Sequence, residues 1–164
     1  MTRTVHDLRR ETVRALDLGA AVLVAAGGYL HFCLYRNGYR TIPTIGTAFL
    51  LQVIASSLVA LALVLPIHFA IRIGRHRLRA STGIRLAGIG LSAGTLVAFL
   101  LSRLPGGIFN FEERGLQPAP QSLITLVAEG GAVLLLAAGL VLEAVDRRQA
   151  ARPVAVMRRP RSLV

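Results

Sequence analysis

Three polar side chains stand inside long apolar stretches of the sequence, where groups that exchange a proton or hold a ligand are rare. They are His31, Gln52 and Glu129. An ionisable residue inside hydrocarbon is costly, so its presence indicates a functional site. An imidazole and a carboxyl group can pass a proton between them, and burial in hydrocarbon favours the neutral form of each. These residue types therefore predict a proton or cation site, or a hydrogen-bonding contact for a quinone or another cofactor.

Counting along the chain places the three residues in one half of the membrane. At about 1.5 Å of helical rise per residue, His31 lies about 6 Å from the outer end of its apolar run, Gln52 about 13 Å and Glu129 about 12 Å. The sequence does not fix the rotation of each helix, so it leaves open whether the three side chains meet. A structural role is the alternative, because interhelical hydrogen bonds contribute about 0.6 kcal/mol each. Two metal-ligating side chains are too few for a closed zinc site, and we expect no metal.

The surrounding sequence is that of a membrane protein. Of the 164 residues, 54% are hydrophobic and 16% are charged, whereas average soluble domains have about 25% charged residues. Each apolar run approaches the length of about 20 residues that crosses a bilayer, and none alternates as barrel strands do. We expect an all-α, four-transmembrane-helix bundle in one domain over residues 1–146, with a basic, disordered tail over 147–164. The helices are predicted at about 15–35, 42–67, 84–103 and 122–144.

Two segments beside these helices need separate interpretation. The first apolar run is longer than the core of a signal peptide and ends in Tyr35-Arg36-Asn37 rather than at small residues, so we expect it to stay uncleaved. Residues 68–79 follow the second run, and we expect them to extend that helix beyond the membrane. The single cysteine, Cys33, excludes an intramolecular disulfide.

The arginines predict the orientation. All 19 basic residues are arginine, and fifteen of them lie before the first run, between the second and third runs, or after the fourth. Positive charge concentrates on the cytoplasmic side, so we expect a multi-pass protein of a bacterial cytoplasmic membrane with both termini in the cytoplasm. The basic edges suit anionic lipid headgroups, and we expect no nucleic-acid partner because the tail lacks aromatic residues for base stacking. Asp17, Glu143 and Asp146 fall at the cytoplasmic helix ends, where charges need no special role.

The predicted external segments and the small residues suggest contacts with partners. Arg40 in the first external turn, and Glu112 and Glu113 in the longer external loop, are candidate contact residues. Small side chains let helices pack closely, and one face of the third helix could pack against another protein. The glycines predicted to serve helix packing are Gly27, Gly28, Gly90, Gly94, Gly130 and Gly131.

Several short stretches resemble a bacterial family. They are Gly28-Tyr29-Leu30-His31, Tyr39-Arg40-Thr41-Ile42-Pro43-Thr44-Ile45-Gly46, Phe49-Leu50-Leu51-Gln52 and Phe109-Asn110-Phe111-Glu112, together with Glu129. This pattern is similar to that of uncharacterised small four-helix integral membrane proteins of actinobacteria. The resemblance implies a four-helix topology and a bacterial source, and it implies no activity. It marks His31, Arg40, Pro43, Gln52, Glu112 and Glu129 as the positions of greatest interest.

The function expected from these features is that of a non-catalytic accessory subunit. The chain has no HExxH or P-loop motif and no soluble domain for a nucleotide, so we favour a non-enzymatic role. The partners would be subunits of a larger membrane assembly, such as a respiratory complex, or a second copy of the chain. One alternative is a small transporter coupled to protons or cations through Glu129 and His31. The other is a quinone- or haem-associated redox protein; the sequence identifies no cofactor.

Overall fold

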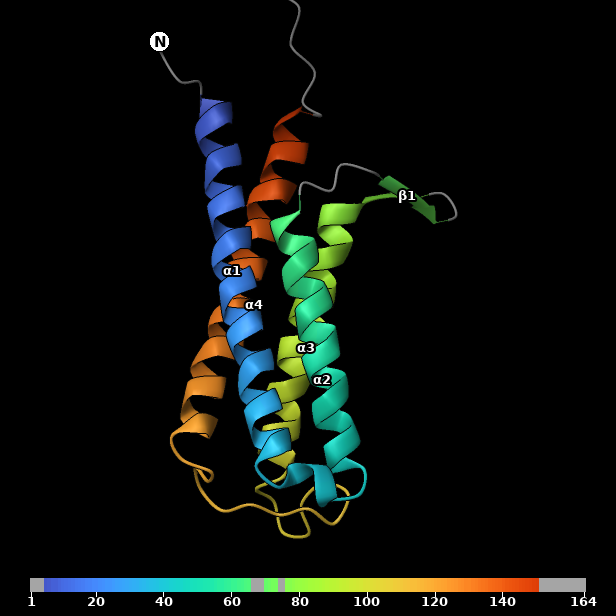
Figure 1. Ribbon diagram of the computed structural model, residues 1–164. Helices are drawn as coiled ribbons and strands as arrows, with labels where there is room; N and C mark the ends of the chain where they lie inside the picture. Colours follow the sequence, from blue (N-terminus) through green and yellow to red (C-terminus); the bar gives the residue numbers. More distant parts are fainter. Residues whose placement is uncertain (1–4, 66–69, 74–75, 151–164) are drawn as a thin grey trace, which may run out of the picture.

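The computed structural model describes residues 5–65, 70–73 and 76–150, and four long helices dominate it (Figure 1). All four are long and apolar enough to cross a membrane. The chain is therefore a multi-pass membrane protein with a helical bundle, as the composition predicts. A short 3-10 turn, Tyr39–Thr41, joins the first two helices. The helices are α1 (Val5–Arg36), α2 (Ile45–Val64), α3 (Ala80–Leu101) and α4 (Gln121–Ala150).

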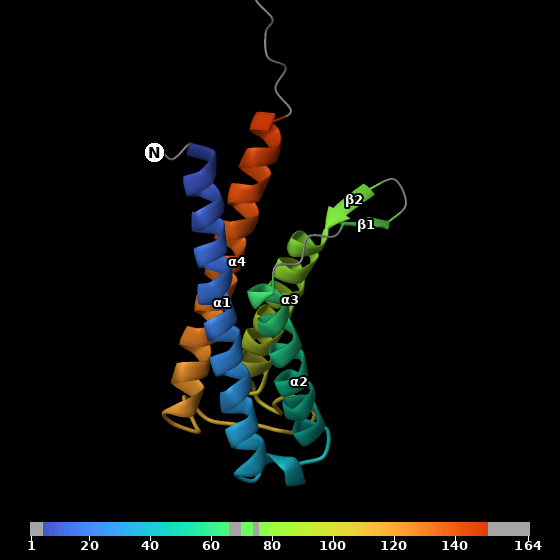
Figure 2. The ribbon, with the colours of Figure 1, turned by 45° about the horizontal axis from the view of Figure 1, so that its top comes forward.

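The four helices form a ring in chain order. Helix α1 packs against both α2 and α4, and α3 packs against α4, while the contact between α2 and α3 is the sparsest (Figures 1 and 2). The start of α1 and the end of α4 lie together, and we call this the terminal end. The opposite end, which we call the loop end, holds residues 37–44 and 102–120. The longer of these two segments runs across the loop end beneath the helices.

The packing of the bundle follows from small residues inside and large apolar residues outside. Ala20, Val24, Ala132 and Leu136 are buried where α1 meets α4, because alanine lets the two backbones approach closely. Helix α2 instead exposes several leucines and Ile54. A helix that is apolar on all sides suits a lipid environment, since lipid requires no polar face. Polar side chains are therefore expected in the interior of the bundle rather than on its lipid-facing surface.

Helix boundaries differ from the predicted ones at the terminal end. Helix α1 begins at Val5, ten residues before the predicted start, and its polar first turns pair with α4 through the ion pair of Arg9 with Asp146. Helix α4 continues to Ala150, so the first four residues of the predicted tail are helical. Residues 151–164 lie outside the described residues. Both extensions show that hydropathy alone underestimates helices that project beyond hydrocarbon.

The segment after α2 does not continue that helix. Helix α2 ends at Val64, and strands β1 (Ala70–Ile73) and β2 (His76–Arg79) form an antiparallel pair in which Ala70 lies opposite Arg79. The predicted helical extension is therefore wrong for residues 70–73 and 76–79, while residues 66–69 lie outside the description. Ile71-Arg72-Ile73 alternates apolar and charged residues, which is the period of a strand.

Candidate functional site

The three polar residues singled out in the sequence come from three helices and face one interior region. Gln52 Nε2 on α2 donates a hydrogen bond to Glu129 Oε1 on α4, at 3.4 Å. On α1, Nδ1 of the buried His31 lies 2.8 Å from the carbonyl oxygen of Gly27. Glu129 is only 1% exposed. The structure thus joins Gln52 to Glu129 directly, and it places His31 beside them without a hydrogen bond to either.

Glycines make room for this arrangement. A Cβ atom on Gly27 would lie 2.6 Å from Glu129 Oε1, which is closer than real Cβ contacts. Gly28 and Gly131 are equally tight, because Cβ atoms there would lie 2.7 Å from Ser56 Cβ and 2.8 Å from Leu23 Cδ1. Three of the six predicted packing glycines therefore lie at helix contacts. The other three meet no atom within 4 Å and do not pack against a helix of the described chain: Gly90, Gly94 and Gly130.

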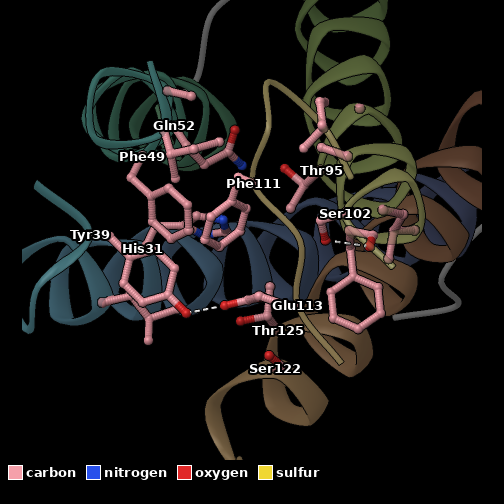
Figure 3. Close-up of a pocket in the computed structure, with 18 of the residues that line it drawn as sticks. His31, Tyr39, Phe49, Gln52, Thr95, Ser102, Phe111, Glu113, Ser122 and Thr125 are labelled. Carbon is pink, nitrogen blue, oxygen red and sulfur yellow. Dashed lines mark hydrogen bonds between the residues drawn. The ribbon is translucent and has the colours of Figure 1, made fainter. Parts of the chain in front are cut away.

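A cavity of about 350 Å³ opens at the loop end, and its walls come from all four helices and the 102–120 segment. Its lining is mainly apolar, with Phe49 and Phe111 beside His31 (Figure 3). Gln52 also lines the cavity, whereas Glu129 lies behind it. Thr125, one turn before Glu129 on α4, adds a hydroxyl group to the wall. The cavity therefore combines a hydrophobic volume with a few polar groups from separate helices.

The longer loop covers the cavity and is held by Arg103. The guanidinium lies 3.1 Å from Glu113 Oε2 and stacks over the ring of Phe99, 3.5 Å from its centroid. Tyr39 donates its hydroxyl proton to Glu113 Oε1, joining the first turn to the loop (Figure 3). Burial, together with this hydrogen bond to a carboxylate, raises the pKa of Tyr39 well above its ordinary value. Hydrogen bonds and one ion pair therefore hold the 102–120 segment over the cavity.

The loop residues predicted to contact an external partner divide into two groups. Arg40 and Glu112 are exposed, and Glu112 Oε2 accepts a hydrogen bond from the Gly106 amide at 3.2 Å. Glu113 instead faces the cavity and binds Arg103 and Tyr39, so it is a wall residue rather than an external one.

A second polar cluster, which the sequence analysis did not identify as a unit, lies toward the terminal end. Arg85 on α3 is 4% exposed and bridges two carboxylates. Its Nε and Nη2 each lie 2.7 Å from the Asp17 carboxylate on α1, and its Nη1 lies 2.6 Å from Glu143 Oε2 on α4. Thr82 donates to the same Glu143 carboxylate at 3.1 Å. We call Asp17, Arg85 and Glu143 the triad.

The triad had a signal in the sequence. Asp17 and Glu143 stand at the same end of their predicted helices, and Arg85 begins the third, so a depth count would have placed all three at one level. Taken singly, Asp17 and Glu143 are charges at helix ends that need no special role, and Arg85 is one of the arginines that predict the orientation. Gly139 supports the arrangement, because a Cβ there would lie 3.3 Å from Arg85 Nε.

A largely apolar layer separates the triad from the cavity. Val24 on α1, and Ala132 and Leu136 on α4, are almost completely buried and lie between the two polar regions along their helices. The buried hydroxyls of Ser56 on α2 and Ser92 on α3 stand at the same level, and neither lines the cavity. The lining of the cavity therefore ends before the triad.

One catalytic sequence pattern occurs in α3. Residues 90–94 read Gly-Leu-Ser-Ala-Gly and match the G-x-S-x-G nucleophile elbow. That motif requires a sharp turn between a strand and a helix, with a base beside the serine. Ser92 lies in the middle of α3, is fully buried, and its Oγ has no hydrogen-bond partner among the described residues. The match therefore carries no catalytic assignment.

No family model, curated protein or solved structure matches this chain. Among residues 5–65, 70–73 and 76–150, no three His, Cys, Asp or Glu side chains gather as a metal site would require. The arrangement of the cavity and its wall is therefore the basis for assigning a function.

Proposed function

We propose that this chain is a multi-pass protein of a bacterial cytoplasmic membrane that binds an amphipathic small molecule in the cavity at its loop end. The observation that carries the proposal is the cavity itself, with an apolar wall and polar groups at His31, Gln52 and Thr125. Small-molecule sites have volumes of about 300–1,000 Å³, mostly apolar linings and a few placed polar groups. The cavity of about 350 Å³ has each of these properties.

The proposed orientation puts both termini in the cytoplasm and the cavity in the outer half of the membrane. Fifteen of the 19 arginines lie in the sequence before the first apolar run, between the second and third, or after the fourth. The other four stand at the loop end, namely Arg36 at the end of α1, and Arg40, Arg103 and Arg114 in the two loop segments. The positive-inside rule then assigns the terminal end to the cytoplasm. The ligand would enter from the outer leaflet or from outside the cell.

A binding site agrees with the geometry better than a transport path does. The largely apolar layer of Val24, Ala132 and Leu136 lies between the cavity and the triad, and its two buried hydroxyls, Ser56 and Ser92, do not line the cavity. A proton- or cation-coupled transporter using Glu129 and His31 would have to open that layer in every cycle. We therefore place binding ahead of transport.

The test uses two glycines of α3. Gly94 lines the cavity and Gly83 does not, and a Cβ on either would meet no atom within 4 Å. Gly94→Leu should fill the cavity, while Gly83→Leu is the matched control on the same helix. We expect native mass spectrometry of protein released from its membrane to show a bound small molecule on the wild type and on Gly83→Leu, and none on Gly94→Leu. A wild-type protein without a bound molecule, or equal retention by all three, would contradict the proposal.

A second candidate function is that of a non-catalytic accessory subunit of a larger membrane assembly. It is favoured by two exposed small residues one turn apart on α3, Gly83 and Ala87, which do not line the cavity as Gly90 and Gly94 do. A helix of another subunit can approach such small residues closely. Gly83→Leu should then lose proteins that co-purify with the wild type from native membranes, whereas Gly130→Leu on α4 should retain them. Recovery of the wild type alone would contradict this function and leave the binding proposal standing.

A further inference from the structure

The hydrogen-bond donors in the cavity wall are almost all engaged within the protein. Arg103 donates from Nε to Gly115 at 3.1 Å, from Nη2 to Gln117 at 2.6 Å, and from Nη1 to Phe99 at 3.3 Å and to Ser102 Oγ. The second N–H of Nη2 lies toward Glu113 Oε2. An arginine has five N–H donors, so this one has none to spare for a ligand.

The hydroxyl groups of the wall are engaged in the same way. Tyr39 donates to Glu113, and Thr95 donates to the carbonyl of its own helix at Leu91. Ser102 and Ser122 donate to the carbonyls of Phe99 and Gln117. Each of these hydroxyl protons is engaged in a hydrogen bond, so only the oxygen lone pairs remain for a ligand.

His31 offers an acceptor as well. Its Nδ1 faces the Gly27 carbonyl oxygen at 2.8 Å, and a carbonyl oxygen can only accept, so Nδ1 carries the proton. The ring is buried and forms no ion pair in the described part of the chain, and the neutral imidazole is the form that hydrocarbon favours. Its Nε2, on the side of the ring away from α1, then presents a lone pair.

Gln52 and Thr125 complete the wall. The Gln52 amide nitrogen donates one N–H to Glu129 Oε1, which leaves its second N–H as a donor and its side-chain oxygen as an acceptor. Thr125 is 8% exposed, and its Oγ1 has no hydrogen-bond partner among the described residues. Ser56 and Ser92 are unpaired in the same way without lining the cavity, so the unpaired wall groups that bear on a ligand are those of His31 and Gln52.

We infer that the ligand of this cavity carries a hydrogen-bond-donating head group, a hydroxyl, on an apolar chain. The inference rests on the proposed binding function and narrows it to one class. A head group that can only accept, such as a quinone carbonyl or an ether, would face the lone pairs of His31 and Gln52 without a proton between them. A hydroxyl donates to one of these lone pairs and can accept from the second N–H of Gln52, so the wall favours it over a head group that only accepts.

The test compares 1-decanol with 1-methoxydecane, which share a ten-carbon chain and differ in the donor. The full-length protein, labelled with ¹⁵N-histidine and held in lipid nanodiscs, is titrated with each. The sequence has 4 histidines, and the variant His31→Gln identifies the resonance of His31. We expect 1-decanol to shift the Nε2 resonance of His31, and 1-methoxydecane to bind about tenfold or more weakly, because an unpaired buried acceptor costs about that much.

The outcomes separate this inference from the proposed function. Equal affinities for the two probes would overturn the donor requirement while leaving the binding site in place. The same holds if neither probe changes the His31 resonance while the wild-type protein still carries a bound molecule that Gly94→Leu lacks. Absence of both the shift and any bound molecule would overturn the two proposals together. A selective shift with 1-decanol supports the inference.

Discussion

The bundle holds two buried polar regions, and they satisfy their charges and hydrogen bonds in different ways. In the triad, a guanidinium lies between two carboxylates, with distances of 2.6 and 2.7 Å from nitrogen to oxygen. At the loop end, Glu129 has an amide neighbour at 3.4 Å and no cation within the described residues. The triad is complete within the chain, whereas the cavity wall leaves acceptors and one hydroxyl unpaired.

This difference indicates which region is structural and which is functional. A buried ion pair whose hydrogen-bonding groups are all paired holds helices in register. It has no donor or acceptor left for a ligand. Polar groups that line an open volume without partners are what a binding site requires. The triad ties α1, α3 and α4 together toward the terminal end, whereas the cavity at the loop end lies among all four helices.

The largest effect should come from breaking the triad. Arg85→Met leaves Asp17 and Glu143 buried without a cation, and removing one partner of a buried pair costs about 3–5 kcal/mol. We expect a large fall in melting temperature in detergent, whereas the exposed Arg148→Met should change little. Replacing the whole triad with apolar residues, as Asp17→Leu, Arg85→Met and Glu143→Leu, should recover most of the loss. An unchanged melting temperature in the single variant would contradict the structural role.

A smaller effect is expected at the contact between α1 and Glu129. Gly27→Ala places a methyl group 2.6 Å from Glu129 Oε1, and such overpacking costs about 1–3 kcal/mol. Gly130→Ala is the control, because a Cβ there meets no atom within 4 Å and alanine is favoured over glycine in a helix. Melting of the two variants in the same detergent measures the difference. Equal stability would show that α1 and α4 are less closely packed at this level.

The stability that Tyr39 contributes to the cover of the cavity should depend on pH. The folded protein raises the pKa of Tyr39 above its unfolded value of 10.0, so the neutral phenol stabilises the fold. That stability is complete below pH 10 and is lost as the pH rises further, because the unfolded chain then releases the proton first. The melting temperature of the wild type should fall above pH 10 by more than that of Tyr39→Phe. Parallel curves for the two proteins would exclude the hydrogen bond between Tyr39 and Glu113.

The smallest effect is expected from Glu129→Gln. Glu129 has no cationic partner in the described chain, so a neutral amide of the same shape should change stability by less than about 1 kcal/mol. Asp17→Asn in the triad is the matched change, and it should cost more because it weakens two contacts with Arg85. A larger loss from Glu129→Gln than from Asp17→Asn would reverse the comparison between the two regions.

The sequence predicted the helices more fully than their interior. Hydropathy located four membrane-spanning segments, and counting by helical rise put Gln52 and Glu129 at the level where they do meet. The rotation of the helices and the course of residues 102–120 depend on long-range packing, so neither the cavity nor the inward position of Glu113 could be predicted. The triad depends on contacts that join Asp17, Arg85 and Glu143 across three helices, and only a comparison of their depths could predict it.

The most direct test of a ligand site at the loop end is an experimental structure of the protein isolated in its native lipid. We predict elongated density in the cavity, with one end within hydrogen-bonding distance of His31 Nε2 and Gln52 Oε1, and no density beyond Val24 and Leu136. A cavity collapsed by contact of α2 with α3, or one whose His31 and Gln52 bond only to each other, would contradict the account.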